Sequence, residues 1–220
     1  MKKIVIIGAG GFGREVKMLI DQINYNKKKF DFIGFYDDNI EKGSMINGFK
    51  VLGSIDELLQ VDYNLEVVIS IADPTIKKKI YETINCNHFI SFPTLIHPNV
   101  LIGTDEVSFG YGCIICASNI ITVNISIGNF VILNLGCTVG HDTKIGDYCS
   151  FMPSVNISGG VIIENSVYVG TGAVVIQVVK IGKWATIGAG AVIIHDVPDF
   201  AVVVGNPGKI IKYTSFDNIS

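Results

Sequence analysis

The sequence is short of charge and of long apolar runs, and each shortage excludes a class of protein. Charged residues make up 17% of the 220 residues, the formal net charge is −3, and no long basic run occurs, so nucleic-acid binding has little support. No stretch approaches the roughly 20 consecutive apolar residues of a membrane-spanning helix. We therefore expect neither a nucleic-acid partner nor membrane insertion.

The N-terminal apolar segment, residues 4–7, lacks the features of a secretory signal. It runs at once into glycines and then meets Arg14 and Glu15, and no small-x-small cleavage site follows. The five cysteines have no framework spacing and do not contradict a reducing compartment. These features predict a cytoplasmic protein.

What the first part of the chain does contain is an alternation of strands and helices. Apolar runs and helical spacing predict strand, helix, strand, short helix, strand and helix, in that order, at 3–7, 14–24, 32–36, 56–59, 66–71 and 74–84. This order amounts to about half of a dinucleotide-binding fold. We therefore predict an α/β half-Rossmann domain over residues 1–92.

A glycine-rich turn, Gly8–Gly13, joins the first strand to the first helix and matches the pattern G-x-G-x-x-G. Glycine lets the backbone approach a ligand, and a helix N-terminus favours an anion. Two carboxylates after the second strand could accept hydrogen bonds from a ribose or a base. Three interpretations stay open: a structural turn, a full NAD site, which the missing half of the fold disfavours, and a site for a nucleotide-linked substrate. For the last, the predicted substrate-binding residues are Gly10, Gly11, Phe12, Gly13, Asp37 and Asp38.

The second part of the chain repeats with a period of six. From Phe109 to Ile193 an apolar residue occupies every sixth position without a miss, and glycine often follows it. Four residues after each apolar site the side chain is usually small or β-branched, as at Ala173. A period of six fits neither a helix nor a two-faced sheet, but it fits a coil with three short strands per turn. We predict an all-β parallel β-helix with a C-terminal cap over residues 93–220.

The same register makes predictions about the cysteines and the ends of the array. Cys113, Cys137 and Cys149 fall on the small inward positions and are predicted to pack in the core. Cys113-x-x-Cys116 has no second pair that would complete a metal site, and we predict no metal. Upstream, Ile102-Gly103 resembles another hexad one residue out of frame, which we interpret as a local bulge. Such a solenoid needs caps, and we expect the N-terminal domain and the last segment to supply them.

The array, the half-Rossmann domain before it and the closing segment Val203–Lys209 together resemble the bacterial sugar O- and N-acyltransferases. These are the sialic acid O-acetyltransferase type and the nucleotide-linked 4-amino-sugar N-acetyltransferases of surface-glycan pathways. The glycine turn, Asp37-Asp38 and Gly140-His141-Asp142 add to the resemblance. It implies a left-handed β-helix, a homotrimer, acetyl-CoA in grooves between adjacent β-helices, and a nucleotide-sugar site between the small domain and a neighbouring subunit.

The resemblance also directs the prediction of cofactor contacts. Acetyl-CoA is expected at corner positions late in the array, and a phosphate is expected at a lysine beside the Gly-Asn-Pro-Gly turn because of its charge. The predicted cofactor-binding residues are Ser150, Gly159, Gly170, Gly188 and Lys209.

His141 is the strongest candidate for catalysis. It is predicted to point outward near a corner of the β-helix, where an imidazole could take a proton as an amine or hydroxyl attacks a thioester. The alternative is a solvated histidine with no role. Asp142 could orient the ring or simply be exposed, and the resemblance implies that Asn134 is a hydrogen-bond partner of the base. His195 has the same hexad position three coils further along, roughly 14 Å away, which is too far for direct cooperation.

These residues support one leading function and leave rivals. The leading prediction is direct transfer of an acetyl group from acetyl-CoA to a nucleotide-linked 4-amino-4,6-dideoxysugar in a ternary complex, with no acyl-enzyme. An O-acetyltransferase acting on sialic acid would use the same fold and base. A non-catalytic nucleotide-binding β-helix is the rival of another class. A metal-dependent β-helix enzyme needs several histidine ligands on neighbouring corners, and only His141 and His195 lie in the array.

Overall fold

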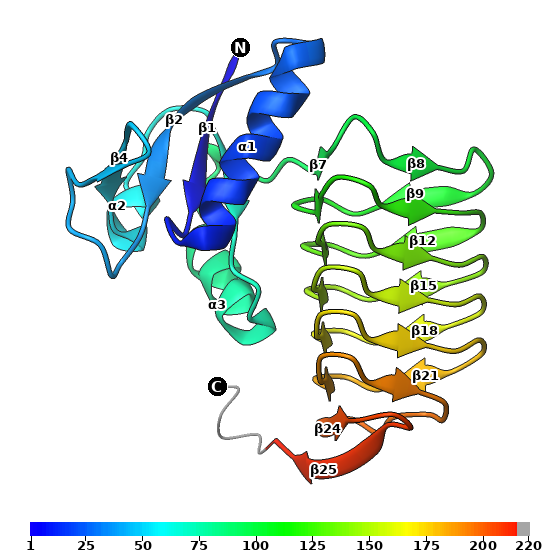
Figure 1. Cartoon of the computed structure of the whole chain (residues 1–220). Coiled ribbons are helices and arrows are strands. Elements are labelled where there is room, and N and C mark those ends of the chain that lie inside the picture. The colour runs from blue at the N-terminus through cyan, green and yellow to red at the C-terminus, as the bar shows by residue number, and fades with distance from the viewer. Residues whose placement is uncertain (215–220) are drawn as a thin grey trace.

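The computed structural model of the chain describes residues 1–214 and sets an α/β domain beside a β-helix (Figure 1). β6 closes the sheet of the first domain and β7 opens the β-helix, so the architecture changes between residues 91 and 95. No helix within the described part of the chain is long and apolar enough to cross a membrane.

The α/β domain is one six-stranded sheet with helices packed against it. The strands follow each other across the sheet in the order β3 (Met45–Ile46), β4 (Phe49–Gly53), β2 (Phe30–Tyr36), β1 (Lys2–Ile7), β5 (Leu65–Ile69) and β6 (Ile90–Ser91). All neighbours pair in parallel except β3, which pairs antiparallel with β4. The chain moves from β1 to β2 on one side and returns to β5 on the other, so the strand order reverses between β1 and β5.

The three helices are α1 (Gly11–Asn26), α2 (Ile55–Leu59) and α3 (Pro74–Ile84). α3 begins as the sequence predicts, because Asp73 caps it by accepting from the backbone N–H groups of Thr75 and Ile76, and Pro74 fills the first turn. α1 begins earlier than predicted, so Gly11, Phe12 and Gly13 form its first turn instead of a loop. The hairpin of β3 and β4 was not predicted, and the short strand expected at His88 forms two residues later, as β6.

The β-helix has three flat faces, each a parallel sheet. Face 1 contains β7 (Leu95–Ile96), β10 (Ile114–Ile115), β13 (Ile132–Leu133), β16 (Ser150–Phe151), β19 (Tyr168–Val169), β22 (Thr186–Ile187), β24 (Ala201–Val204) and β25 (Lys209–Tyr213). Face 2 contains β8 (Leu101–Ile102), β11 (Ile120–Ile121), β14 (Thr138–Val139), β17 (Asn156–Ile157), β20 (Val174–Val175) and β23 (Val192–Ile193). Face 3 contains β9 (Val107–Phe109), β12 (Ile125–Ile127), β15 (Lys144–Ile145), β18 (Ile162–Ile163) and β21 (Lys180–Ile181).

The predicted hexad register is confirmed. Each strand from β9 to β20 pairs with the strand 18 residues later, for example Ile132 with Ser150 and Thr138 with Asn156, so three hexads make one coil. The inward residues from Ile115 to Ile193 and the small residues, including Cys113, Cys137 and Cys149, form one buried core. The out-of-frame hexad at Ile102 is not a bulge, because β9 pairs with β12 without a register shift and the extra residue lies in the turn before β9.

Turns of four residues join the faces at three corners, which we call corner 1–2, corner 2–3 and corner 3–1 after the faces they connect. The third residue of these turns takes a positive φ at every sixth position from Gly112 to Gly190. Glycine accepts this left-handed conformation readily, whereas bulky residues are rare there. Corner 3–1 nevertheless carries Phe130, Tyr148 and Trp184, with φ of 53°, 61° and 59°.

The α/β domain packs on the side of the β-helix and does not cap its end, contrary to our expectation (Figure 1). α1 buries Val16, Leu19 and Ile20 in one cluster with Ile114 and Ile132 of face 1. These outward-facing residues of face 1 are apolar because a helix covers them. The C-terminal end of the β-helix is closed by the predicted cap. There β24 continues face 1 and pairs antiparallel with β25.

α3 attaches along corner 3–1. Tyr81 of α3 sits in a cluster of aromatic rings with Phe92, Tyr111, Phe130 and Tyr148, with centroid distances from Tyr81 of 4.6 to 6.2 Å. Edge-to-face and stacked ring pairs of this kind add to the free energy of burial. The bulky corner residues Phe130 and Tyr148 are therefore explained by the helix that covers them.

Candidate functional site

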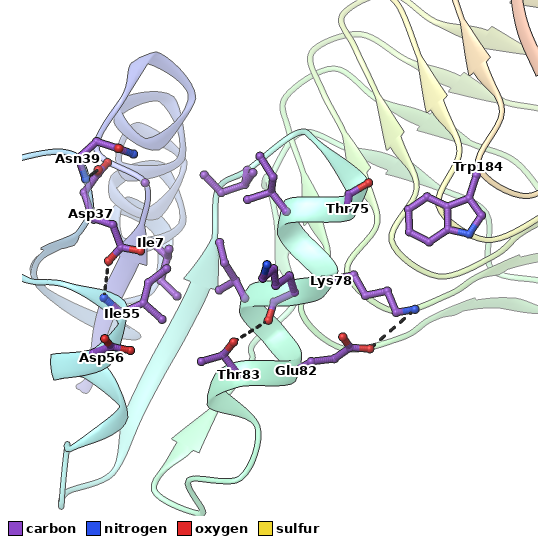
Figure 2. A pocket seen from close by; sticks show the side chains of 16 residues that line it. Ile7, Asp37, Asn39, Ile55, Asp56, Thr75, Lys78, Glu82, Thr83 and Trp184 are labelled. Carbon is purple, nitrogen blue, oxygen red and sulfur yellow. Dashed lines mark hydrogen bonds and ion pairs between the residues drawn. The ribbon is translucent and has the colours of Figure 1, made fainter. Parts of the chain in front are cut away.

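A cavity lies at the carboxyl ends of the strands of the α/β domain, lined by α2, by α3 and by one residue of the β-helix (Figure 2). Its volume is about 710 Å³, enough for a nucleotide-sized ligand. The ends of β1 and β5 border it, which is the point where the strand order reverses and where ligands bind in open α/β sheets. Its lining residues are Ile7, Gly8, Asp37, Asp38, Asn39, Ile55, Asp56, Ile71, Thr75, Ile76, Lys78, Lys79, Ile80, Glu82, Thr83 and Trp184.

Asp37 and Asp38 line this cavity, but each also holds the fold together. Asp37 accepts from the backbone N–H of Ala9 at 2.9 Å and so ties the glycine turn to the end of β2. Asp38 accepts from the backbone N–H of Ile55 at 2.8 Å, at the start of α2. Asp37 also accepts from the backbone N–H of Asn39 at 2.9 Å, so both of its oxygens and one oxygen of Asp38 have structural partners, and a ligand would share the remaining lone pairs.

The glycines of the turn divide into two groups. Gly13 has a packing role, because a Cβ there would meet the carbonyl oxygen of Gly8 at 1.9 Å. A Cβ on Gly10 would meet nothing within 4 Å, and one on Gly11 only the end of Arg14 at 3.9 Å, so the backbone is open to a ligand at these two positions. Of the whole turn, only Gly8 lines the cavity itself, and Phe12 packs partly buried against the core of the domain.

The wall opposite the carboxylates carries positive charge and an aromatic ring. Figure 2 shows Lys78 and its ion-pair partner Glu82 on the face of α3 that is turned toward Trp184, while Asp37 and Asp56 lie on the other side of the helix. The Lys78 ammonium is 5.6 Å from the centroid of the Trp184 ring. Sequence reasoning missed this wall, because nothing in the sequence of α3 tells which corner of the β-helix the helix will meet.

His141 and Asp142 project from corner 2–3, where both side chains are exposed. His141 Nδ1 and Asp142 Oδ2 are 2.7 Å apart, and Asp142 Oδ1 accepts from the amide of Asn124 at 3.0 Å. The hydrogen bond with His141 lowers the pKa of the Asp142 carboxyl, and the bond from Asn124 lowers it further. Gly159 lies one coil on, and a Cβ there would meet His141 Nε2 at 2.5 Å, so the absence of a side chain makes room for the imidazole.

Asn134 lies on a different corner. It follows β13 at corner 1–2, where its side chain accepts from the backbone N–H of Leu135 at 2.7 Å. Gly170 and Gly188 occupy the same position two and three coils further along, after β19 and β22. One chain therefore does not bring Asn134, Gly170 and Gly188 together with His141 and Gly159.

The assignment of Ser150 to cofactor binding needs correction. Ser150 faces outward from face 1, but it is fully buried under α3 and accepts a hydrogen bond of 2.8 Å from Lys77 Nζ. Lys77 also donates to the carbonyl oxygen of Cys149 at 3.3 Å, and burial lowers its pKa to about 7. Ser150 therefore belongs to the domain interface. Lys209 is exposed at the start of β25, in the cap.

The remaining histidine and cysteine candidates lie apart from His141 or are not reactive. His195 lies at corner 2–3, 54 residues or three coils after His141, in the last turn of that corner. Burial raises the pKa of the thiols of Cys116, Cys137 and Cys149 to about 12, 11 and 12, so they are not poised as nucleophiles. Within residues 1–214, no three histidine, cysteine or acidic side chains gather in a way that could hold a metal.

Known proteins share both the fold and the sequence of this chain. Residues 3–84 match the family described as the PglD N-terminal domain. GDP-perosamine N-acetyltransferase of Escherichia coli O157:H7 is 35% identical over 214 residues, which cover 94% of this chain and 95% of that protein.

Solved structures agree over the same length. The acetyltransferase domain of PglB from Neisseria gonorrhoeae FA1090, in complex with acetyl coenzyme A, is 30% identical with a TM-score of 0.87 over 96% of this chain and 99% of that one. Perosamine N-acetyltransferase from Caulobacter crescentus, with one histidine replaced by asparagine and in complex with CoA and GDP-perosamine, is 27% identical with a TM-score of 0.84 over 96% and 98%.

These matches span both domains, so the matched proteins combine the α/β domain and the left-handed β-helix in the same way as this chain. They confirm the predicted fold, the predicted acyltransferase activity and acetyl-CoA as the co-substrate. The chain belongs to the hexapeptide-repeat family of acetyl-CoA-dependent sugar N-acetyltransferases.

Proposed function

We propose that this enzyme transfers an acetyl group from acetyl-CoA to the 4-amino group of a nucleotide-linked 4-amino-4,6-dideoxysugar, with GDP-perosamine as the leading candidate. The proposal is supported by the full-length similarity to GDP-perosamine N-acetyltransferase and to a structure that holds CoA and GDP-perosamine. Because nucleotide sugars and acetyl-CoA are cytoplasmic metabolites, the proposal includes a cytoplasmic location and a role in surface-glycan synthesis.

His141 is the proposed general base. As the amine nitrogen attacks the thioester carbonyl, the imidazole accepts the proton that the amine loses, and collapse of the tetrahedral intermediate breaks the carbon–sulfur bond. The imidazolium then returns the proton to the CoA thiolate, so no acyl-enzyme forms. Asp142, bonded to Nδ1, would hold the ring with Nε2 toward the substrate and stabilise the imidazolium.

The proposed active unit is a homotrimer, and the observation that carries it is the separation of the cavity from His141. The α/β domain with its nucleotide-sized cavity packs on face 1, whereas His141 projects from corner 2–3, the corner opposite that face. The six residues of one face span up to about 20 Å at about 3.3 Å per residue, so His141 is about one face width from either edge of face 1 in its own chain.

A neighbouring copy resolves the separation. In a cyclic trimer, corner 2–3 of one copy would meet corner 1–2 of the next, which brings His141 and Gly159 beside the neighbour's copies of Asn134, Gly170 and Gly188. Face 2 would then turn toward the three-fold axis. Its outward residues Leu101 and Ile120 are 64% and 42% exposed in the single chain, which is unusual for apolar side chains unless a partner covers them.

The acceptor is tested by thiol release from acetyl-CoA with GDP-perosamine, the corresponding UDP- and dTDP-linked 4-amino-4,6-dideoxysugars, and free sialic acid. We expect turnover with an amino-sugar nucleotide, GDP-perosamine first, and a product with an amide at C4 by mass spectrometry. Turnover with sialic acid alone would replace the proposal by O-acetylation. Turnover with none of the four would overturn the proposed substrate class.

A further inference from the structure

Trp184 is the only tryptophan in the sequence, and it is the only cavity-lining residue that comes from the β-helix. All other lining residues belong to the α/β domain. Trp184 is half-buried at corner 3–1, and Figure 2 shows its ring directed toward α3 across from Lys78. A ligand in the cavity that reaches this ring would therefore contact both domains at once.

The backbone at Trp184 makes a bulky side chain costly. Its φ is 59°, in the left-handed region where most corners of this β-helix place glycine, serine, asparagine or aspartate. Phe130 and Tyr148, earlier in the same corner column, pack into the aromatic cluster under α3. Trp184 lies beyond that cluster at the border of the cavity, so the cluster does not account for it.

The surroundings of Trp184 suit a nucleotide. The Lys78 ammonium lies over one face of the ring, 5.6 Å from its centroid, and its ion pair with Glu82 is long, at 3.7 Å, so the flexible side chain can turn its charge to an anion and free that face. A flat aromatic ring offers a stacking surface to any nucleobase, and a lysine beside it can meet a phosphate. The carboxylates of Asp37, Asp38 and Asp56 lie at the other end of the cavity, where they would repel a diphosphate, and Glu82 is the lining carboxylate that a diphosphate at Lys78 would have to displace.

We propose that Trp184 is a ligand-contacting residue of the nucleotide-sugar site, with its ring as the stacking surface for the nucleobase and Lys78 as the cation for the diphosphate. This inference rests on the proposed function. It adds that the β-helix takes part in nucleotide binding, so the bound nucleotide joins the two domains.

The test is calorimetric titration of GDP into the wild-type protein and the variants Trp184→Phe and Trp184→Ala. Stacking on an aromatic ring is worth between about fivefold and about a hundredfold in affinity, so the alanine variant should lose that much and the phenylalanine variant should keep most of it. Because stacking is tolerant of the base, UDP should weaken by a similar factor in the alanine variant.

Val178→Ala is the matched control. Val178 is another bulky corner residue with positive φ, 60°, and it is 76% exposed at corner 2–3, away from the cavity. This substitution relieves the same kind of backbone strain, and GDP affinity should stay at the wild-type value. A general effect of corner substitutions on the fold would instead lower the affinity in both alanine variants, and that outcome would overturn the inference.

Fluorescence gives an independent readout that needs no turnover. Since Trp184 is the only indole, saturating GDP should change the emission of the wild-type protein, and the change should disappear in Trp184→Phe. An unchanged GDP affinity in Trp184→Ala, with only the melting temperature lowered, would show a purely structural residue and overturn the inference while leaving the proposed function intact. A wild-type protein that binds none of GDP, UDP and dTDP would overturn both.

Discussion

Corner 2–3 and corner 3–1 of the β-helix are built by the same hexad, yet they carry different chemistry. Corner 3–1 is covered by α3, and its outward residues are aromatic rings packed around Tyr81. Corner 2–3 is bare in the single chain, and its most elaborate group is the pair of His141 and Asp142, 67% and 58% exposed. The comparison teaches that the repeat fixes where a corner residue points, while the element that covers the corner decides its role.

The largest expected effect comes from combining one defect at each corner. We expect the variant His141→Ala and the cavity-filling variant Thr75→Trp to be inactive separately. Co-expressed and purified as mixed trimers, they should recover about one third of wild-type activity, because each mixed trimer has one site of three that combines an intact histidine with an intact cavity from different copies. The measurement is thiol release by complexes purified through one affinity tag on each variant.

A mixed complex as inactive as its parents would contradict the shared site and show that cavity and base act within one chain. Size-exclusion chromatography with light scattering on the same sample controls for assembly. A mixed trimer that recovers no activity would show that the protein assembles as a trimer but that its active site is not shared between copies.

The second prediction compares two histidines of corner 2–3. His141→Asn should lower kcat/KM by about 10²–10⁴-fold, the usual loss when a general base is removed. His195→Asn is the matched control, because His195 also follows a face 2 strand and precedes an aspartate, but it lies three coils away. It should keep kcat/KM within about twofold, since surface substitutions remote from a site rarely matter. Similar losses of kcat/KM in the two variants would show that His141 is not the general base.

The smallest effect concerns the covered corner 3–1 and its buried Lys77. Burial lowers the pKa of Lys77 to about 7 in the folded protein, while an unfolded lysine binds its proton up to a pH of about 10.4. Between these values unfolding takes up a proton, so this residue makes the protein more stable as the pH rises from 7 to 10. Lys77→Met should abolish that contribution.

The measurement is the free energy of unfolding by urea for wild type and Lys77→Met at pH 7, 8.5 and 10. Wild type should gain on the order of a few kcal/mol relative to the variant across this range. The difference between the two proteins, followed against pH, cancels the titration of tyrosines and thiols common to both. A constant difference would mean that Lys77 stays charged in the fold.

The β-helix was predictable almost residue by residue because its pattern is local. An inward residue every six positions and a small residue four later can be counted on the chain, and the core contains the residues so counted. The extra residue after Ile102 was visible as well, but a count of residues does not tell a bulge in a strand from a longer turn.

The candidate site was predictable only in its separate parts. His141, Asp37 and the glycine turn stand out through their neighbours in sequence. The covering of Ser150 by Lys77 and the meeting of Trp184 with α3 depend on how the α/β domain docks on face 1, across more than 70 residues of chain. No local pattern encodes that docking. Ser150 was therefore wrongly assigned to cofactor binding, and Trp184 was not identified as a cavity residue.

The 18-residue pairing of the coils has a consequence for how the length of such a chain can change. Removing or adding a few residues within a face would shift every later side chain around the axis and turn core residues outward, whereas gain or loss of one whole coil leaves all later contacts in register. The corners tolerate single residues, as the longer turn before β9 shows. Deletion of one coil between His141 and the cap would therefore yield a folded protein whose β-helix is shorter by one strand spacing, about 4.8 Å.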